Sequence, residues 1–132
     1  MSNEYGMRQS LSMNYADAIP AVKAALKEEG FGVLTEIDVK ATMKQKLNEE
    51  YRPYIILGAC NPNLAHKGLQ AEPELGLLLP CNVIVYDAGD DTSVVSIVDP
   101  MIMVGVAENS ALQEMATEAN ARLTRVLESL QE

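Results

Sequence analysis

The sequence predicts an α+β fold, in which a long C-terminal helix lies across a sheet. Two apolar segments, residues 81–87 and 92–99, are joined by the polar connection 88–91, which is typical of a hairpin. From Leu112 onward, apolar residues recur at spacings of three or four, as on one face of a helix. A length of 132 residues fits one domain that covers residues 1–132.

The N-terminal region predicts a strand followed by a helix. Residues 4–13 alternate between polar and mainly apolar side chains, which indicates a half-buried strand. A helix is expected from about Asn14 or Tyr15 to Gly30, because glycine readily adopts the left-handed conformation of a helix stop. Since proline is tolerated near a helix start but not in the middle, the firm part should begin close to Pro20.

A second strand and a short helix are expected next. Residues 31–38 contain the apolar positions of a strand that ends at Asp38, and the Asp38 side chain can cap a helix. This short helix is expected to end before Pro53. Its predicted apolar stripe consists of Val39, Met43 and Leu47.

The middle of the chain contains a junction between a strand and a helix. Residues 54–59 are apolar at both odd and even positions, which predicts a strand covered on both faces. Asn61 and Pro62 then combine a favoured N-cap with a favoured first helical residue. The helix that begins there is expected to end at Pro73.

The C-terminal helix is predicted to begin at a capping box. After an apolar link over residues 101–106, Ser110 and Gln113 match the pattern S-x-x-Q. The helix should reach about Gln131, and at about 1.5 Å per residue it would be roughly 33 Å long. That length is enough to cross a small sheet.

Composition disfavours several classes of function. The chain has 19 carboxylates against ten Lys and Arg, and its net charge of −9 disfavours binding to nucleic acids or anionic membranes. We find no apolar run long enough to span a bilayer and no signal-peptide pattern. The protein is therefore expected in the cytoplasm, where its two cysteines would stay reduced.

Two Cys-Asn pairs at predicted strand ends form the candidate site. Cys60 precedes the Asn61 cap, where unpaired N–H groups and the helix dipole stabilise an anion. A thiol there can have a lowered pKa and act as a nucleophile; the alternative is a buried side chain beside a purely structural cap. Cys81 and Asn82 begin the hairpin, and strands that end side by side would bring Cys81 near Cys60, as two thiols or as a disulfide.

Asp99 and His66 are two further polar residues that could contribute to this site. Asp99 could present a carboxylate at a strand end, or it could simply form a turn with Pro100. His66 is the only histidine, but helical spacing places it opposite the apolar face, so a surface histidine is expected. The sequence shows no metal-ligand spacing, no Gly-rich phosphate loop and no complete catalytic set, and it names no cofactor.

A resemblance to a known family is carried by residues 29–38, 57–62 and 76–83 and by Asp99-Pro100. These segments are similar to the bacterial and archaeal domain-of-unknown-function 302 family, and the resemblance covers nearly the whole chain. It implies a curved, mainly antiparallel sheet of β-α-β(4)-α type, with short extra helices and a long C-terminal helix across it, like half of the TATA-binding protein. It also implies a possible homodimer, but no activity.

These features predict a small-ligand-binding or regulatory module with a pocket near Cys60 and Asn61. The predicted lining of this pocket also includes Cys81, Asn82 and Asp99. Two alternatives remain open. One is a thiol-dependent enzyme or redox protein that uses Cys60, and the other is a structural module that binds a partner through its sheet or its C-terminal helix.

Overall fold

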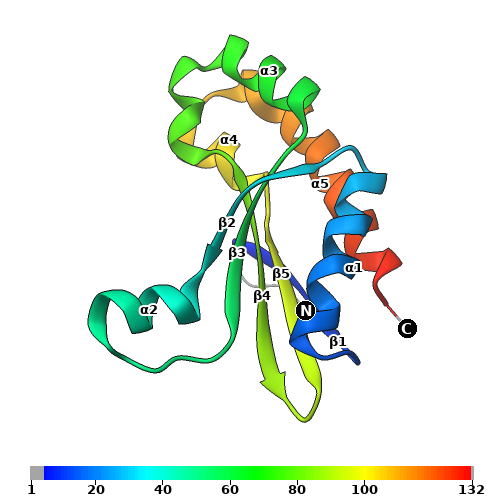
Figure 1. Cartoon of the computed structure of the whole chain (residues 1–132). Helices are drawn as coiled ribbons and strands as arrows, with labels where there is room; N and C mark the ends of the chain where they lie inside the picture. The colour runs from blue at the N-terminus through cyan, green and yellow to red at the C-terminus, as the bar shows by residue number, and fades with distance from the viewer. Residues whose placement is uncertain (1–4, 132) are drawn as a thin grey trace.

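Over residues 5–131, which the computed structural model describes, the chain forms a five-stranded curved sheet (Figure 1). The strand order is β1-β5-β4-β3-β2, and every neighbouring pair is antiparallel. The strands are β1 (Gly6–Leu11), β2 (Gly32–Asp38), β3 (Tyr54–Cys60), β4 (Cys81–Gly89) and β5 (Thr92–Val98). The predicted α+β fold with an antiparallel sheet is confirmed; part of the predicted strand 4–13, residue 4, lies outside the described residues.

Helices connect and cover these strands. They are α1 (Tyr15–Glu28), α2 (Val39–Leu47), α3 (Pro62–Ala71), α4 (Ile102–Ala107) and α5 (Gln113–Ser129), with the short 3-10 helices η1 (Pro73–Leu78) and η2 (Ser110–Leu112). In Figure 1, α1 and α5 lie together against one face of the sheet, whereas α2 projects from the opposite side.

The core lies between this covered sheet face and the two helices. Leu57, Val83 and Val95 from three adjacent strands are fully buried, as are Val22 from α1 and Leu123 from α5. Burial of each such side chain contributes about 1.5–3 kcal/mol before conformational entropy is counted. The spacing of the apolar residues therefore correctly predicted a C-terminal helix packed across the sheet.

Side-chain caps begin three helices, and two of these caps, Asp38 and Asn61, were predicted from the sequence. Asn14 Oδ1 accepts a hydrogen bond from Asp17 N at 2.8 Å, and Asp38 Oδ1 accepts one from Ala41 N at 2.9 Å. Asn61 caps α3 in the same way. Each cap satisfies a backbone N–H that the first turn of a helix leaves without a partner.

Two details of the helix starts differ from the predictions. Helix α1 is firm well before Pro20, because Ala18 in the preceding turn is fully buried. The expected capping box at Ser110 is also wrong: the Asn109 side chain accepts a hydrogen bond from Ala111 N, and α5 starts only after the turn η2. Asparagine is as good a cap as serine, and the turn was not distinguishable in sequence.

The expected apolar link at 101–106 and the segment after Pro73 also form short helices, α4 and η1. Helix α4 has six residues, and η1 has 3-10 geometry. Segments this short show too few helical repeats for a periodicity to be recognised.

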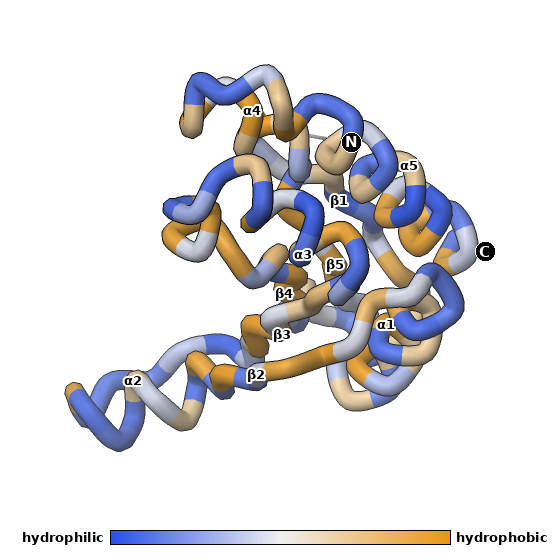
Figure 2. Tube along the Cα trace, turned by 90° about the horizontal axis from the view of Figure 1, so that it is seen from above, coloured by the Kyte–Doolittle hydropathy of each residue, from blue (hydrophilic) through white to orange (hydrophobic). Residues whose placement is uncertain are grey.

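The segment from β2 to β3 is more exposed than predicted. Figure 2 shows α2 as a mainly hydrophilic helix that projects away from the remainder of the molecule. None of its residues is buried, and Leu47, from its predicted apolar stripe, is 64% exposed. Strand β3 is not covered on both faces either, because Ile56 is only half-buried while its neighbour Leu57 is fully buried. The prediction that β3 is covered on both faces, made from its apolar residues at both odd and even positions, is therefore wrong.

Candidate functional site

The predicted site residues lie at one end of the sheet. Strand β3 ends at Cys60, β4 begins at Cys81, and β5 ends just before Asp99. Because β3, β4 and β5 are neighbours in an antiparallel sheet, the end of β3, the start of β4 and the end of β5 lie side by side at the same end of the sheet. The arrangement expected for the two cysteines is therefore present, but the side chains around them differ in their roles.

Cys60, Asn61 and Cys81 line a small apolar cavity under the start of α3. Phe31, Leu64 and Met115 complete much of its wall, and its volume is about 20 Å³. This is room for about one water molecule, whereas pockets for small ligands usually have volumes of about 300–1,000 Å³. The cavity therefore offers no space for a metabolite.

The environment of the two thiols keeps them protonated. Both cysteines are free. Burial raises the pKa of Cys60, and burial together with the nearby Cys60 raises the pKa of Cys81 to about 11. Of the two alternatives for Cys60, this favours the buried side chain beside a structural cap over a nucleophile with a lowered pKa, because desolvation disfavours the thiolate. These thiols are poorly suited to nucleophilic chemistry at neutral pH.

Asn61 has a clear structural role. It is 8% exposed, and its Oδ1 accepts a hydrogen bond from Leu64 N at 3.2 Å. Its Nδ2 lies so close to the turn after α1 that a Cβ atom at Gly30 would be 2.9 Å away. Gly30 also has a φ of +83°, which non-glycine residues rarely adopt. Asn61 thus joins the start of α3 to the end of α1.

Asn82 and Asp99 lie outside the small cavity. Asn82 is exposed and lines a separate hollow of about 260 Å³, beside Pro80 and Val98. The Asp99 side chain belongs to a turn: its Oδ1 accepts hydrogen bonds from Met101 N and Asn120 Nδ2, both at 2.9 Å. The five predicted site residues therefore do not enclose one pocket.

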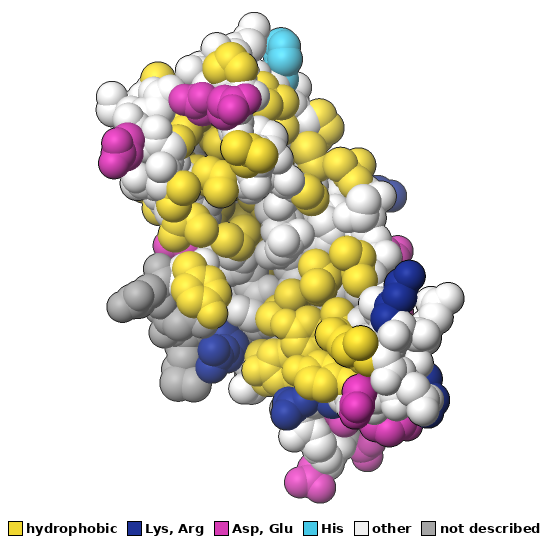
Figure 3. All heavy atoms as spheres, turned by 90° about the vertical axis from the view of Figure 1, so that its left-hand side faces the viewer, with side chains coloured by type: hydrophobic (Ala, Val, Ile, Leu, Met, Phe, Trp, Pro, Cys, Tyr) yellow, Lys and Arg dark blue, Asp and Glu magenta, His cyan; other side chains and the backbone are white. Residues whose placement is uncertain are grey.

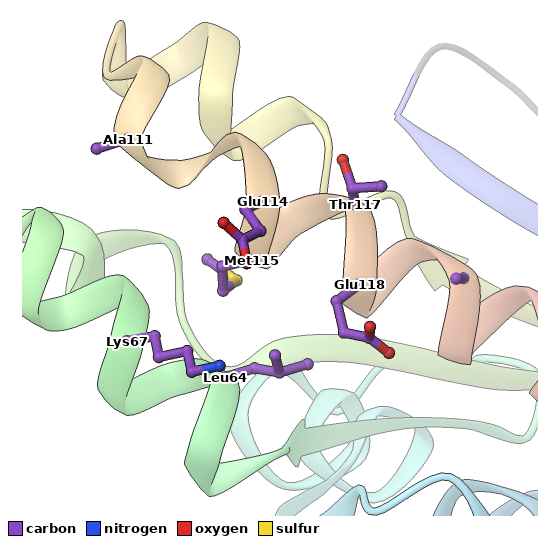
Figure 4. Close-up of a pocket in the computed structure, with 8 residues that line it drawn as sticks. Leu64, Lys67, Ala111, Glu114, Met115, Thr117 and Glu118 are labelled. Atoms are coloured by element: carbon purple, nitrogen blue, oxygen red, sulfur yellow. The ribbon is translucent and has the colours of Figure 1, made fainter.

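A larger groove lies between α3 and α5, next to Asn61. It consists of two adjoining hollows of about 820 and 540 Å³, which share Leu64, Lys67 and Glu118 in their linings. Figure 4 shows the narrower hollow, with Lys67 reaching from α3 towards the side where Glu114 and Glu118 project from α5. The polar side chains along the groove include Asn61, His66, Lys67, Glu114, Glu118 and Arg122.

The charges in this groove are partly paired. Arg122 Nε donates to Glu118 at 2.8 Å, and its NH1 group donates to the backbone oxygen of Glu29 at 3.1 Å. Among the described residues, Lys67 and Glu114 form no ion pair within 4.0 Å, so both present charge to the open groove. His66 is exposed on its rim, as a surface histidine was predicted to be.

The sequence did not reveal this groove, because α3 and α5 are far apart along the chain. Each helix has an ordinary polar face, and only the packing of the two helices brings Lys67 opposite Glu114. In the part of the chain that the structure describes, no group of three or more His, Cys, Asp or Glu residues is arranged to hold a metal ion. Residues 5–131 also contain no helix with the length and apolarity needed to cross a bilayer.

Comparisons with known proteins identify a family and a similar solved structure. A family model described as "Domain of unknown function DUF302" matches residues 7–130. The crystal structure of an uncharacterized conserved DUF302 protein from Bacillus stearothermophilus is similar, with a TM-score of 0.88 and 29% sequence identity. The similarity covers 98% of this chain and 100% of that chain. No protein of curated function matches.

Proposed function

The chain belongs to the DUF302 family, whose function is unknown, and from this premise we propose a small-ligand-binding domain with its ligand in the groove between α3 and α5. The observation that carries this proposal is the size of the groove. Its two hollows of about 820 and 540 Å³ are in the range of ligand sites, whereas the cavity beside Cys60 has about 20 Å³. The proposed ligand site is therefore the groove on the outer side of Asn61 and not the cavity beside the two thiols.

The charges of the groove favour a ligand that carries both signs. Lys67 on one wall attracts an anionic group, while Glu114 on the other attracts a cationic group. A simple anion would be repelled by the carboxylate, and a simple cation by the ammonium group. We therefore propose a small zwitterion, of the amino-acid class, as the ligand.

An NMR titration tests this function. The labelled protein would be titrated with a panel of amino acids, and with acetate and methylamine, each of which carries one charge alone. We expect shifts in residues 63–67 and 114–122 with at least one amino acid. Acetate and methylamine should bind about tenfold more weakly or not at all, since a charged hydrogen bond contributes about 1.5–3 kcal/mol.

Matched variants sharpen the same test. Lys67→Gln and Glu114→Gln should each weaken binding by about tenfold. Lys46→Gln, in the distant helix α2, should leave it unchanged. Shifts confined to residues around Cys60, or the absence of shifts with every probe, would reject the groove as the ligand site.

A second candidate function is partner binding, with a second copy of this chain as the partner. The observation that favours it is the sheet face opposite α1 and α5, where half-buried apolar residues are not covered by those helices (Figure 1). Sedimentation velocity over a range of concentrations tests whether the protein is a homodimer. We also propose the cytoplasm as its location, in keeping with two free cysteines.

Thiol-dependent catalysis is the least supported of the three functions. Burial raises the pKa of both cysteines, so little thiolate is present at neutral pH. His66 lies on the groove rim and is not part of the lining of the small cavity that contains both cysteines. Alkylation of the native protein at pH 7 should accordingly be slow for Cys60 and slower still for Cys81.

A further inference from the structure

The groove between α3 and α5 differs in net charge between its two hollows. The larger hollow, of about 820 Å³, is lined by two cationic side chains, Lys67 and Arg122, and by one carboxylate, Glu118. The smaller hollow, of about 540 Å³, shares Lys67 and Glu118 but has Glu114 in place of Arg122. The groove therefore has a positive end at Arg122 and a negative end at Glu114. The side of the molecule away from α1 and α5 presents broad hydrophobic areas instead (Figure 3).

At the positive end, two hydrogen-bond donors converge beside Gly30. Asn61 is 8% exposed, and its Oδ1 accepts from Leu64 N, but its Nδ2 donates to no group in the described part of the chain. A Cβ atom at Gly30 would be 2.9 Å from Asn61 Nδ2 and 3.5 Å from Arg122 Nη1. Gly30 lines the larger hollow but not the small cavity of the thiols, so the Nδ2 group is on the groove side of Asn61.

The start of α3 and the guanidinium group complete this set of donors. Asn63 lines the larger hollow, and its N–H, in the first turn of a ten-residue helix, has no acceptor among the described residues. Arg122 is held by Glu118 through Nε and by the backbone oxygen of Glu29 through Nη1, which leaves its Nη2 without a partner there. A helix start, an amide N–H and a guanidinium are donors suited to a carboxylate.

The spacing of the two charged ends indicates the length of the ligand. Glu114 and Arg122 are eight residues apart on α5, which is about 12 Å along the helix axis. In a free α-amino acid, one carbon joins the charged groups, so the nitrogen and the carboxylate carbon are only about 2.5 Å apart. An extended peptide of three residues spans about 10 Å, and the long side chains of Glu114 and Arg122 can bridge the remaining distance.

We propose that the ligand of this groove is a short peptide of about three residues with both termini free. Its C-terminal carboxylate accepts hydrogen bonds from Asn61 Nδ2, Asn63 N–H and Arg122, and its N-terminal ammonium group pairs with the Glu114 carboxylate. Lys67, which lines both hollows, lies between these ends and can donate to a peptide carbonyl oxygen. This peptide site rests on the ligand site proposed above and extends its ligand from an amino acid to a peptide.

NMR titration of the full chain with trialanine and its capped forms tests this peptide site. We expect shifts in residues 63–67 and 114–122, and binding of trialanine at least tenfold tighter than that of alanine. N-acetyl-trialanine lacks the ammonium group and trialanine amide lacks the carboxylate, so each should bind about tenfold more weakly than trialanine.

Two variants locate the carboxylate of the peptide. Asn61→Asp keeps an oxygen to cap α3, because aspartate caps a helix as well as asparagine, but it replaces the donor with a carboxylate. It should weaken trialanine binding by tenfold or more without weakening that of trialanine amide. Arg122→Gln, at a partly exposed position, should act in the same direction. Asn14→Asp makes the same change at the cap of α1, outside the groove, and should leave trialanine binding unchanged; circular dichroism verifies that each variant folds.

The outcomes separate the peptide from the ligand site itself. No shift in the groove with trialanine or with any amino acid would overturn both proposals. An amino acid that binds as tightly as trialanine, or more tightly, would keep the groove as the ligand site but overturn the peptide. Trialanine binding that Asn61→Asp and Arg122→Gln leave unchanged would overturn the proposed carboxylate site.

Discussion

Cys81 should make the stability of this protein fall at high pH. Its thiol is almost fully buried, and that burial, with Cys60 nearby, raises its pKa from 9.0 to about 11. The folded state therefore holds the thiol proton more tightly than the unfolded state. The stabilisation is fully present below pH 9, the unfolded value, and it is lost as the pH rises towards the folded value.

The size of the loss follows from the two pKa values. Relative to neutral pH, the Cys81 contribution to the free energy of unfolding should fall by about 1 kcal/mol at pH 10 and about 2 kcal/mol at pH 11. Other groups titrate in the same range, so the measured quantity is the difference between the unmodified chain and Cys81→Ala. This substitution also leaves a small cavity, but its cost does not depend on pH and cancels when the difference is followed across pH.

Urea unfolding at pH 7, 9, 10 and 11 measures this difference. We expect the advantage of the unmodified chain over Cys81→Ala to shrink above pH 9, and the variant to gain about 2 kcal/mol by pH 11 relative to its deficit at pH 7. Cys60→Ala is the control: Cys60 is less buried than Cys81, so a smaller change is expected. A constant difference between the unmodified chain and Cys81→Ala from pH 7 to pH 11 would refute the argument from burial.

Two further predictions concern residues that support the structure around the predicted site, Gly58 and Asp99. Gly58→Ala should destabilise the protein by about 1–3 kcal/mol, because the new Cβ would lie 2.7 Å from Pro80 Cγ and in contact with Thr35 Oγ1. Gly105→Ala is the control: its new Cβ would meet no atom within 4 Å, so this variant should be neutral or slightly stabilised. Thermal unfolding of both variants measures the difference. Asp99→Ala should lower the free energy of unfolding in urea by about 1–3 kcal/mol, because Met101 N–H and Asn120 Nδ2 lose their acceptor. Asp99→Asn keeps an acceptor oxygen and should lower it less. Equal losses in the two variants would contradict the role of Asp99 as a hydrogen-bond acceptor.

Local chemistry made much of the fold predictable. Asn14, Asp38 and Asn61 each precede a helix whose first turn needs an acceptor, and each does cap that helix. The hairpin between β4 and β5 was predictable for the same reason, because Asp90 and Asp91 tolerate the positive φ that its turn requires. Such features depend on neighbours in sequence, so one sequence is enough to recognise them.

The environment of Cys60 could not be predicted in this way. A helix start favours a thiolate, and burial disfavours it; both effects are general, and their balance depends on what packs over the residue. Here Phe31, from the turn after α1, and Met115, from α5, close the cavity around the thiol. Both residues are distant in sequence, so the sign of the pKa shift was not available from the junction itself.

The same dependence on distant neighbours explains why the surfaces proposed for binding were missed. Lys67 and Glu114 each lie on an ordinary polar helix face, and a groove arises only because α3 and α5 leave a gap between those faces. The apolar run of β3 suggested a strand covered on both sides, yet Ile56 lies on a face that α1 and α5 do not cover. Apolar side chains at both parities are also what a strand needs when its second face is covered by another copy.

Charge leads to the same conclusion about that face. A net charge of −9 disfavours self-association if the charge is spread evenly, because like charges repel on close approach. In this fold it is not spread evenly: the paired positions of the open sheet face hold no carboxylate, whereas the three lysines of α2 are balanced by Asp38, Glu49 and Glu50 beside the helix. The ion pair between Lys44 and Glu50 is exposed and 3.7 Å long, so it contributes little to stability. The open sheet face is thus the part of this acidic surface where repulsion between carboxylates would oppose the approach of a second copy least.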